Sequence, residues 1–250
     1  MTTLVGGVGQ LYQGDLDLGR VAADRLAAED LGHDVVVEDL HYGAIAVTQR
    51  LEDLRPDALV LVGAAARGRL PGTAERRRVS PVPVDVERFR ETVEQAGTGE
   101  VSIDLIVEVA SGFGALPERT VCIEVEPASI ASSTELSREA AAGLELALEL
   151  VRQDVRRIPL LELGDRLREL LAEDRIEPNP TLAAMERLVE ALAVVDRDGT
   201  WGSVFALRDE LKLRISTGET PEGMTHLDWT QWWGAIEELD RLQALEGAAP

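Results

Sequence analysis

Thr3-Leu-Val-Gly-Gly-Val-Gly-Gln-Leu-Tyr-Gln-Gly-Asp-Leu-Asp-Leu-Gly19 is the stretch that decides the fold. Its first six residues are a short apolar run ending in glycines, which predicts a buried strand. A glycine-rich turn follows. The next segment, 17–30, places Leu18, Ala22 and Leu26 at helical spacing, and Asp15 or Asp17 is expected to cap that helix. A buried strand, a turn and a helix in this order favour an α/β domain.

The same alternation continues toward the middle of the chain. Residues 58–62 are fully apolar, as expected for a strand of a parallel sheet that is covered on both faces. The sequence therefore predicts a three-layer α/β/α domain with a mostly parallel sheet. Further strands are predicted at 34–39 and 119–125, an edge strand at 75–82, and helices at 44–54, 84–95 and 101–113.

The character of the chain changes after Arg156. A long helix is predicted over 133–156, with a capping-box start at Ser133. No clear strand pattern follows, so a helical C-terminal extension is expected, and we predict two domains, 1–156 and 157–250. Helices are predicted in the extension at 160–172, 181–195 and 229–245, and it holds all four tryptophans, Trp201, Trp229, Trp232 and Trp233.

Composition narrows the function classes. The chain has 250 residues, 45% of them hydrophobic, and a formal net charge of −21. Such an acidic chain argues against nucleic acid and against anionic membrane surfaces as partners. No run of 18 apolar residues occurs, and the expected location is the cytoplasm. Cys122 is the only cysteine, which excludes an internal disulfide, and its apolar neighbours predict a buried core residue.

Ligands of open parallel sheets bind beyond the carboxyl ends of the strands. Three predicted turns lie there: Gly6–Gly19, Glu38–Gly43 and Gly63–Gly68. The first invites a nucleotide-binding interpretation, but Tyr12 stands where a dinucleotide fingerprint needs its third glycine. We therefore expect a site of another kind at this edge.

The motifs, taken in their order, resemble those of the nickel–iron hydrogenase maturation proteases. The first turn is similar to that family's Gly-x-Gly-Asn and Asp-[Asp/Glu]-x-x-Gly pattern. Asp39-Leu-His-Tyr-Gly43 falls where the family tends to have Asp-Gly-Gly-Thr, and a strand and a Pro-Gly-Thr segment match at 57–62 and 70–73. The final strand matches at 119–127. The resemblance covers roughly residues 3–155 and leaves the extension outside.

The resemblance implies a function and a set of site residues. Proteins of that family remove a C-terminal extension from the hydrogenase large subunit after nickel insertion, and an acid, an aspartate and a histidine sense the nickel. Carried over to this chain, those positions fall on Leu16, Gly63 and about Ile103. None of these side chains can bind a metal, so nickel-dependent cleavage is not expected.

Other site residues remain as alternatives. Asp17, Asp39 and His41 could form a rearranged metal site, although Asp15 and Asp17 at a helix start and His41 in a solvent-facing loop are the plainer interpretation. The expected cleft-lining residues are Gly9, Asp15, Leu16, Gly43, Gly63 and Ile103. Trp229, Trp232 and Trp233 follow helical spacing and could bind a partner or pack in a core.

The sequence thus predicts a divergent protease-like protein of hydrogenase maturation or assembly. The expected partner is the hydrogenase large subunit or another maturation protein. No cofactor is expected, and nickel would enter only with a substrate. Two alternatives stay open: an active endopeptidase that uses the rearranged site, and a structural subunit that uses the tryptophan-bearing tail.

Overall fold

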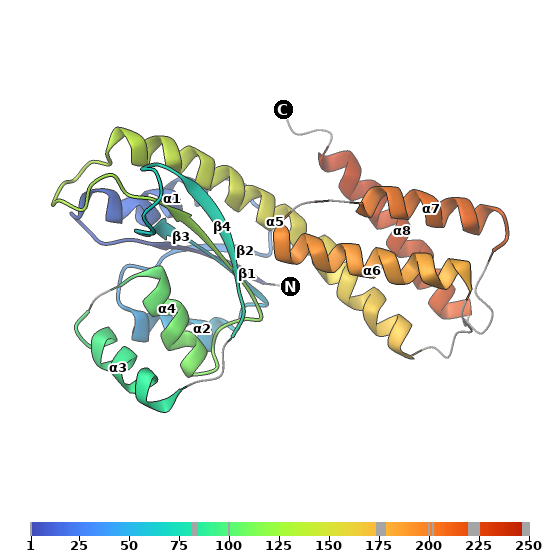
Figure 1. The fold of residues 1–250 in the computed structure, drawn as a ribbon, viewed down its shortest axis with the longest axis horizontal. Coiled ribbons are helices and arrows are strands. Elements are labelled where there is room, and N and C mark those ends of the chain that lie inside the picture. Colours follow the sequence, from blue (N-terminus) through green and yellow to red (C-terminus); the bar gives the residue numbers. More distant parts are fainter. Residues whose placement is uncertain are drawn as a thin grey trace. The chain divides into compact units, whose positions relative to one another are not determined.

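The computed structural model describes residues 2–81, 85–99, 101–173, 179–199, 201, 203–219 and 226–246. The chain divides into two compact units, residues 1–156 and 157–250, here called unit 1 and unit 2. In unit 1 helices cover both faces of a sheet, and unit 2 is helical where it is described (Figure 1). This is the α/β/α class with a helical extension that the sequence predicts.

Unit 1 is built on a five-stranded sheet in the order β2-β1-β3-β5-β4. Neighbouring strands are parallel except at β4, which pairs antiparallel with β5 at one edge. The strands are β1 (Thr3–Val8), β2 (Val35–Asp39), β3 (Ala58–Ala64), β4 (Ala74–Val79) and β5 (Arg119–Val125). All five lie where the sequence predicts strands. The apolar side chains of the parallel strands fill two cores, one on each face.

Each face of the sheet has its own apolar cluster. Side chains such as Leu4, Leu61 and Cys122 lie on one face with α2 and α4. Side chains such as Val5 and Val62 lie on the other face with α1 and α5. The helices of unit 1 are η1 (Gly14–Asp17), α1 (Leu18–Leu26), α2 (Ala44–Leu54), α3 (Val86–Ala96), α4 (Ile103–Gly112) and the first part of α5 (Arg138–Glu173).

The long helix α5 differs from the prediction at both ends. It begins at Arg138 rather than Ser133, and the hydroxyl of Ser137 accepts the N–H of Ala140 there. The expected capping box at Ser133 is therefore wrong. The hydroxyl of Ser133 accepts the backbone N–H of Glu135, in the loop before the helix. The helix also passes Arg156 and contains Pro159, since the apolar residues on either side of the proline are buried.

Unit 2 has a separate core. It consists of buried side chains from the second half of α5, α6 (Pro180–Asp198), α7 (Val204–Ser216) and α8 (His226–Glu246). The sequence analysis did not predict α7. Its apolar residues have helical spacing, but Arg208 interrupts their apolar face. The side chain of Arg208 is buried and forms ion pairs with Asp209 and Asp240.

Candidate functional site

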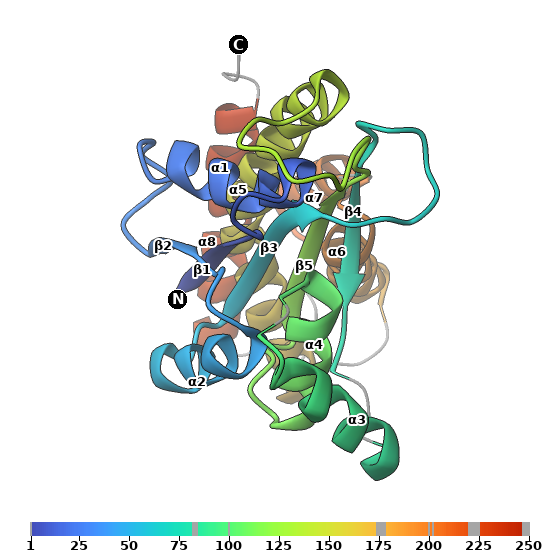
Figure 2. The same ribbon diagram turned by 90° about the vertical axis from the view of Figure 1, so that its left-hand side faces the viewer.

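The candidate site lies at the carboxyl ends of β1 and β3. The chain leaves β1 for β2 on one side and returns to β3 on the other, so the strand order reverses between these two neighbours. Such a switch point is where open α/β sheets bind ligands. Val8 and Gly63 are register partners there. Figure 2 shows unit 1 from the side on which the loops after these strands lie.

Glycines let the first turn pack tightly. A Cβ on Gly7 would clash with the backbone of Gly19, and a Cβ on Gly19 would clash with the backbone of Val8. Strand β1 and helix α1 can therefore meet only at glycines. Gln10 extends from the turn and donates its side-chain amide to the carbonyl of Val101, 2.8 Å away, just before α4. The turn is thus tied to the helix that faces it.

Asp15 is buried and does not cap α1. Its carboxylate accepts from the N–H groups of Ala128, Ser129 and Ser137 and from the hydroxyl of Ser137, at 2.6–2.9 Å. Burial raises the pKa of Asp15, but these hydrogen bonds outweigh it and hold the pKa below its ordinary value. Asp15 therefore fastens the loop after β5 to the first turn, a role that sequence spacing did not indicate.

The carboxylate of Asp17 is likewise bound to another residue. It stands at the start of α1 without a capping hydrogen bond, and its carboxylate binds Arg20 at 2.6 Å. Asp39 and His41 do lie together, with Nδ1 of His41 2.9 Å from Oδ2 of Asp39. In the part of the chain that the structure describes, no group of three or more His, Cys, Asp or Glu side chains is placed to hold a metal ion. The rearranged Asp17, Asp39 and His41 site is not assembled here.

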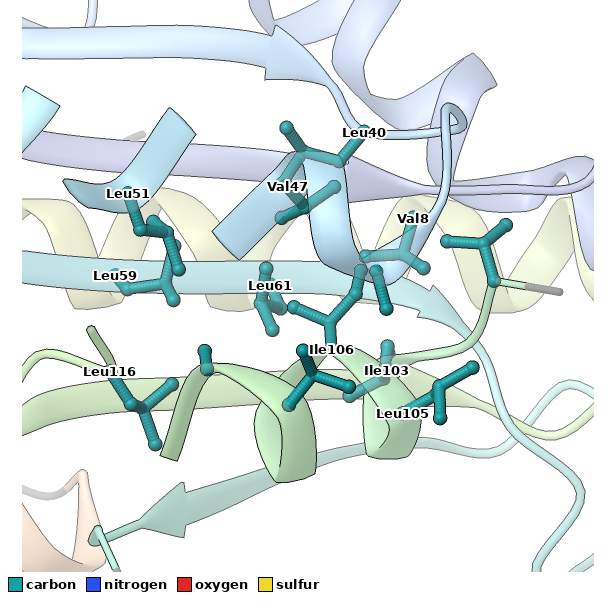
Figure 3. Close-up of a cluster of buried hydrophobic side chains, with 14 of the residues drawn as sticks. Val8, Leu40, Val47, Leu51, Leu59, Leu61, Ile103, Leu105, Ile106 and Leu116 are labelled. Carbon is teal, nitrogen blue, oxygen red and sulfur yellow. The ribbon is translucent and has the colours of Figure 1, made fainter. Parts of the chain in front are cut away.

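The three carried-over ligand positions are apolar, and two of them are in contact. Ile103, at the start of α4, is 1% exposed and belongs to the cluster on that face of the sheet. A Cβ on Gly63 would lie 3.4 Å from Cδ1 of Ile103 and 2.5 Å from the carbonyl oxygen of Val8. Figure 3 shows Val8 and Ile103 in this cluster. Leu16 is half-buried in η1. The switch point is therefore packed with apolar groups.

A cluster of charges lies beside the packed switch point, and we call it the arginine–carboxylate cluster: Arg67, Arg77, Asp104 and Glu124. Glu124 is the register partner of Gly63 on β5 and has no exposed surface. Arg67 binds Glu124 at 2.7 Å and Asp104 at 2.7 Å. Arg77 binds Glu124 at 2.5 Å and Asp104 at 3.1 Å. Asp104 is exposed, and its carboxylate binds both arginines from the solvent side of the cluster.

The guanidinium groups keep both carboxylates ionised. Burial raises the pKa of Glu124, but hydrogen bonds from Arg67 and Arg77 hold that pKa below the usual value. The hydrogen bond from Arg67 likewise lowers the pKa of Asp104. Since the buried Glu124 and the exposed Asp104 are matched by two arginines, the cluster neutralises itself. The only advance signal was the arginine-rich composition of β4, and spacing along the chain could not pair it with Glu124.

The remaining predicted site residues divide by environment. Gly9 is buried, and a Cβ there would lie 3.0 Å from the backbone nitrogen of Arg20. Gly43 has a φ of 96° and open space around it, so it serves the turn before α2. Trp232 is fully buried in the unit 2 core, whereas Trp233 is 41% exposed. Trp232 is therefore unavailable to a partner and does not share a face with Trp233. The side chain of Trp229 lies outside the described residues.

Fold and site together define a class. Unit 1 is an open, mostly parallel α/β/α protein whose switch point is filled by apolar side chains and flanked by a self-neutralised charge cluster.

None of the helices described is both long and apolar enough to span a membrane.

Solved structures with a similar fold have been found for about 60% of the chain. A hydrogenase 2 maturation peptidase from Thaumarchaeota archaeon SCGC_AB-539-E09 is 26% identical over 60% of this chain and 95% of its own, with a TM-score of 0.43. The hydrogenase maturating endopeptidase HybD from E. coli is 26% identical over 60% and 90%, with a TM-score of 0.45. No protein-family model and no curated protein matches the chain. Both solved proteins are named as hydrogenase maturation peptidases, the family that the motifs resemble.

Proposed function

We propose that this chain acts in the maturation or assembly of a nickel–iron hydrogenase as a protease-like protein without nickel-dependent cleavage. The ordered motifs of the resemblance support the first part. Three of these motifs lie at one edge of the sheet: the first turn, Asp39–Gly43, and the end of β3 at Gly63. The proposal includes a cytoplasmic location and, as partner, the hydrogenase large subunit or another maturation protein.

One observation carries the second part. The position of the family's aspartate is Gly63, where a side chain would meet the backbone of Val8 at 2.5 Å. A ligand is therefore missing, and the space for one is missing too. Ile103 closes the same place from α4. Nickel in this proposal belongs to the substrate, and this chain supplies no ligand for it at Leu16, Gly63 or Ile103.

A second candidate is an endopeptidase that uses another arrangement. Asp39 and His41 favour it, because they form a carboxylate–imidazole pair, a pair that can act in acid–base chemistry. Oδ1 of Asp39 is buried without a hydrogen-bond partner. Against it, Asp17 is held by Arg20.

The structural-subunit alternative depends on the tail. Among the described side chains of α8, Trp233 is the tryptophan that a partner could reach. Its indole N–H is bonded to Glu237 at 3.1 Å, four residues along the same helix. A partner could therefore contact the exposed ring without breaking the unit 2 core.

The test uses the full chain and a purified large-subunit precursor, with and without nickel. Binding is measured by a pull-down and cleavage by the intact mass of the precursor. We expect a complex and no loss of the C-terminal extension. Cleavage that disappears in Asp17→Ala or His41→Ala would replace the proposal with the endopeptidase alternative. Loss of the complex in Trp233→Ala would favour the structural subunit, and no complex at all would refute the assigned partner.

A further inference from the structure

Two loops at the carboxyl edge of the sheet are hydrogen-bonded to each other. They are residues 10–14, after β1, and residues 127–134, after β5, and we call them the uncharged loop pair. Backbone bonds join them: the N–H of Ser133 donates to the carbonyl of Tyr12, and the N–H of Gly14 donates to the carbonyl of Ser133. Asp15 adds its bonds to Ala128, Ser129 and Ser137. The pair is therefore a fixed feature of the fold (Figure 2).

The composition of this surface differs from the rest of the molecule. Charged residues make up 28% of the chain, yet neither loop contains one. Large apolar side chains stand on it instead: Leu11 is 44% exposed, Tyr12 68% and Ile130 65%. Single exposed apolar residues need no explanation, but here three of them lie on two short loops that are hydrogen-bonded to each other.

Tyr12 has a strained backbone. Its φ is 62°, in the left-handed region that costs a residue with a Cβ about 1 kcal/mol. A side chain that is 68% exposed gains little from core packing, so the fold itself does not need a tyrosine here. Glycine or asparagine would adopt this φ more easily. Strain kept at an exposed aromatic residue is a feature of binding sites.

We propose that the uncharged loop pair is the docking surface for an apolar segment of a basic partner polypeptide. This rests on the proposed function, in which the partner is a hydrogenase precursor or another maturation protein. The charge argues for a basic partner and against a second copy of this chain. Two molecules of net charge −21 repel each other, whereas a basic protein is attracted over long range.

The two parts of the proposal act on different rate constants. The acidic charge of the whole chain accelerates association, and salt weakens that effect. The apolar contacts of Tyr12 and Ile130 slow dissociation, because short-range contacts are lost only when the complex separates. Aromatic residues at the centre of an interface commonly carry much of its affinity.

The experiment measures association and dissociation of the full chain with purified large-subunit precursor by surface plasmon resonance. The test variant is Tyr12→Asn with Ile130→Ser, because asparagine accepts the left-handed φ and preserves the fold. The matched control is Leu146→Ser, on α5 of the same unit, where the leucine is 59% exposed. Thermal melting checks that both variants fold.

We expect the test variant to dissociate at least about tenfold faster and the control to match the wild type. Raising the salt from about 50 to about 300 mM is expected to slow association. A test variant that binds like the wild type overturns the docking surface and leaves the proposed partner intact. No binding by the wild type overturns the partner and this inference together. Association that salt does not slow refutes the basic partner, and a wild-type dimer that the test variant abolishes identifies a second copy instead.

Discussion

Gly63 shows at the scale of one residue why the site cannot be restored by one side chain. In the resembled family an aspartate stands at this position. Here the backbone of Val8 occupies the space that its Cβ would need, and Ile103 lies beyond. In this chain the position therefore lacks both a ligand side chain and the space for one.

Gly63→Asp is expected to lower the free energy of unfolding by about 2 kcal/mol or more, because it overpacks a buried site and brings a charge into it. It is not expected to create nickel-dependent cleavage. Urea unfolding and the precursor assay measure the two effects. Gly97→Ala, at an exposed helix end, is the control and should change stability by less than about 0.5 kcal/mol. A stable Gly63→Asp variant that cleaves the precursor would contradict the packed site.

Asp15→Asn is expected to cost about 2 kcal/mol or more, since the charged acceptor of four hydrogen bonds is lost. The folded-state pKa of Asp15 is lowered, so its contribution is present above the unfolded pKa, near 3.8, and is lost as pH falls through the folded pKa. The stability difference from wild type should therefore be full at pH 7 and shrink below about pH 4. Denaturant unfolding at both pH values measures it. Asp34→Asn, an exposed acid paired with His33, is the control, and an equal loss there would refute the role of Asp15.

At the scale of elements, the arginine–carboxylate cluster joins β4, β5, α4 and the loop after β3. Glu124 on β5 receives Arg77 from β4 and Arg67 from the loop, and both arginines reach Asp104 on α4. The three successive arginines of this antiparallel edge strand each have partners: Arg77 in the cluster, Arg76 at Asp154 on α5, and Arg78 at the carbonyl of Thr120. The cluster fastens the outer part of the sheet to α4 on one face, and the pair of Arg76 with Asp154 fastens it to α5 on the other.

Replacing both Arg67 and Arg77 with alanine is expected to destabilise unit 1 by about 3 kcal/mol, because the buried Glu124 would keep only the weaker contact with Arg69, 3.6 Å away. Adding Glu124→Gln should recover much of the loss, as the uncompensated charge is then gone. Thermal and urea unfolding measure both variants. Arg90→Ala, from an exposed pair with Glu94, should be almost neutral. If Glu124→Gln gives no recovery, the charge is not the cause.

Helices α5 and α7 show how an element can depart from its sequence pattern. The sequence analysis places separate helices at 133–156 and 160–172, and Pro159 between them lacks the N–H that a helix interior uses. The helix continues because Ile158, Leu160 and Leu161 are buried beside it. In α7, Arg208 occupies a core-facing position and hides the apolar stripe from sequence analysis. The buried arginine is explained by its ion pairs with Asp209 and Asp240 and by the Phe205 ring beneath its guanidinium.

At the scale of the whole molecule, the buried residues form separate cores. Two clusters lie within unit 1 on either side of the sheet, and the third lies within unit 2. Each core draws on residues of its own unit, so each unit has the means to fold independently.

Residues 1–156 and 157–250, expressed separately, are therefore each expected to unfold cooperatively. The first should keep a mixed α/β circular dichroism spectrum and the second a helical one. Binding of the precursor should remain with 1–156, where the uncharged loop pair lies. A fragment 1–156 that fails to fold alone, or a precursor that binds only to 157–250, would contradict this division.

The sequence by itself determined the class of fold and the loops at which a site would form. Continuous apolar runs and helical apolar patterns report burial directly, so the strands and most helices could be predicted, and the buried Cys122 is confirmed. Motif order pointed to the first turn, and Leu16 was recognisable as a non-ligand from its chemistry alone.

Only the tertiary structure decided what the site contains. Asp15 bonds to residues more than 100 positions away, Glu124 meets Arg67 and Arg77 from other elements, and the backbone of Val8 fills the space beside Gly63. Such contacts depend on distances between segments that are remote along the chain. Local patterns hold no record of these distances, because only the packing of the sheet against its helices sets them.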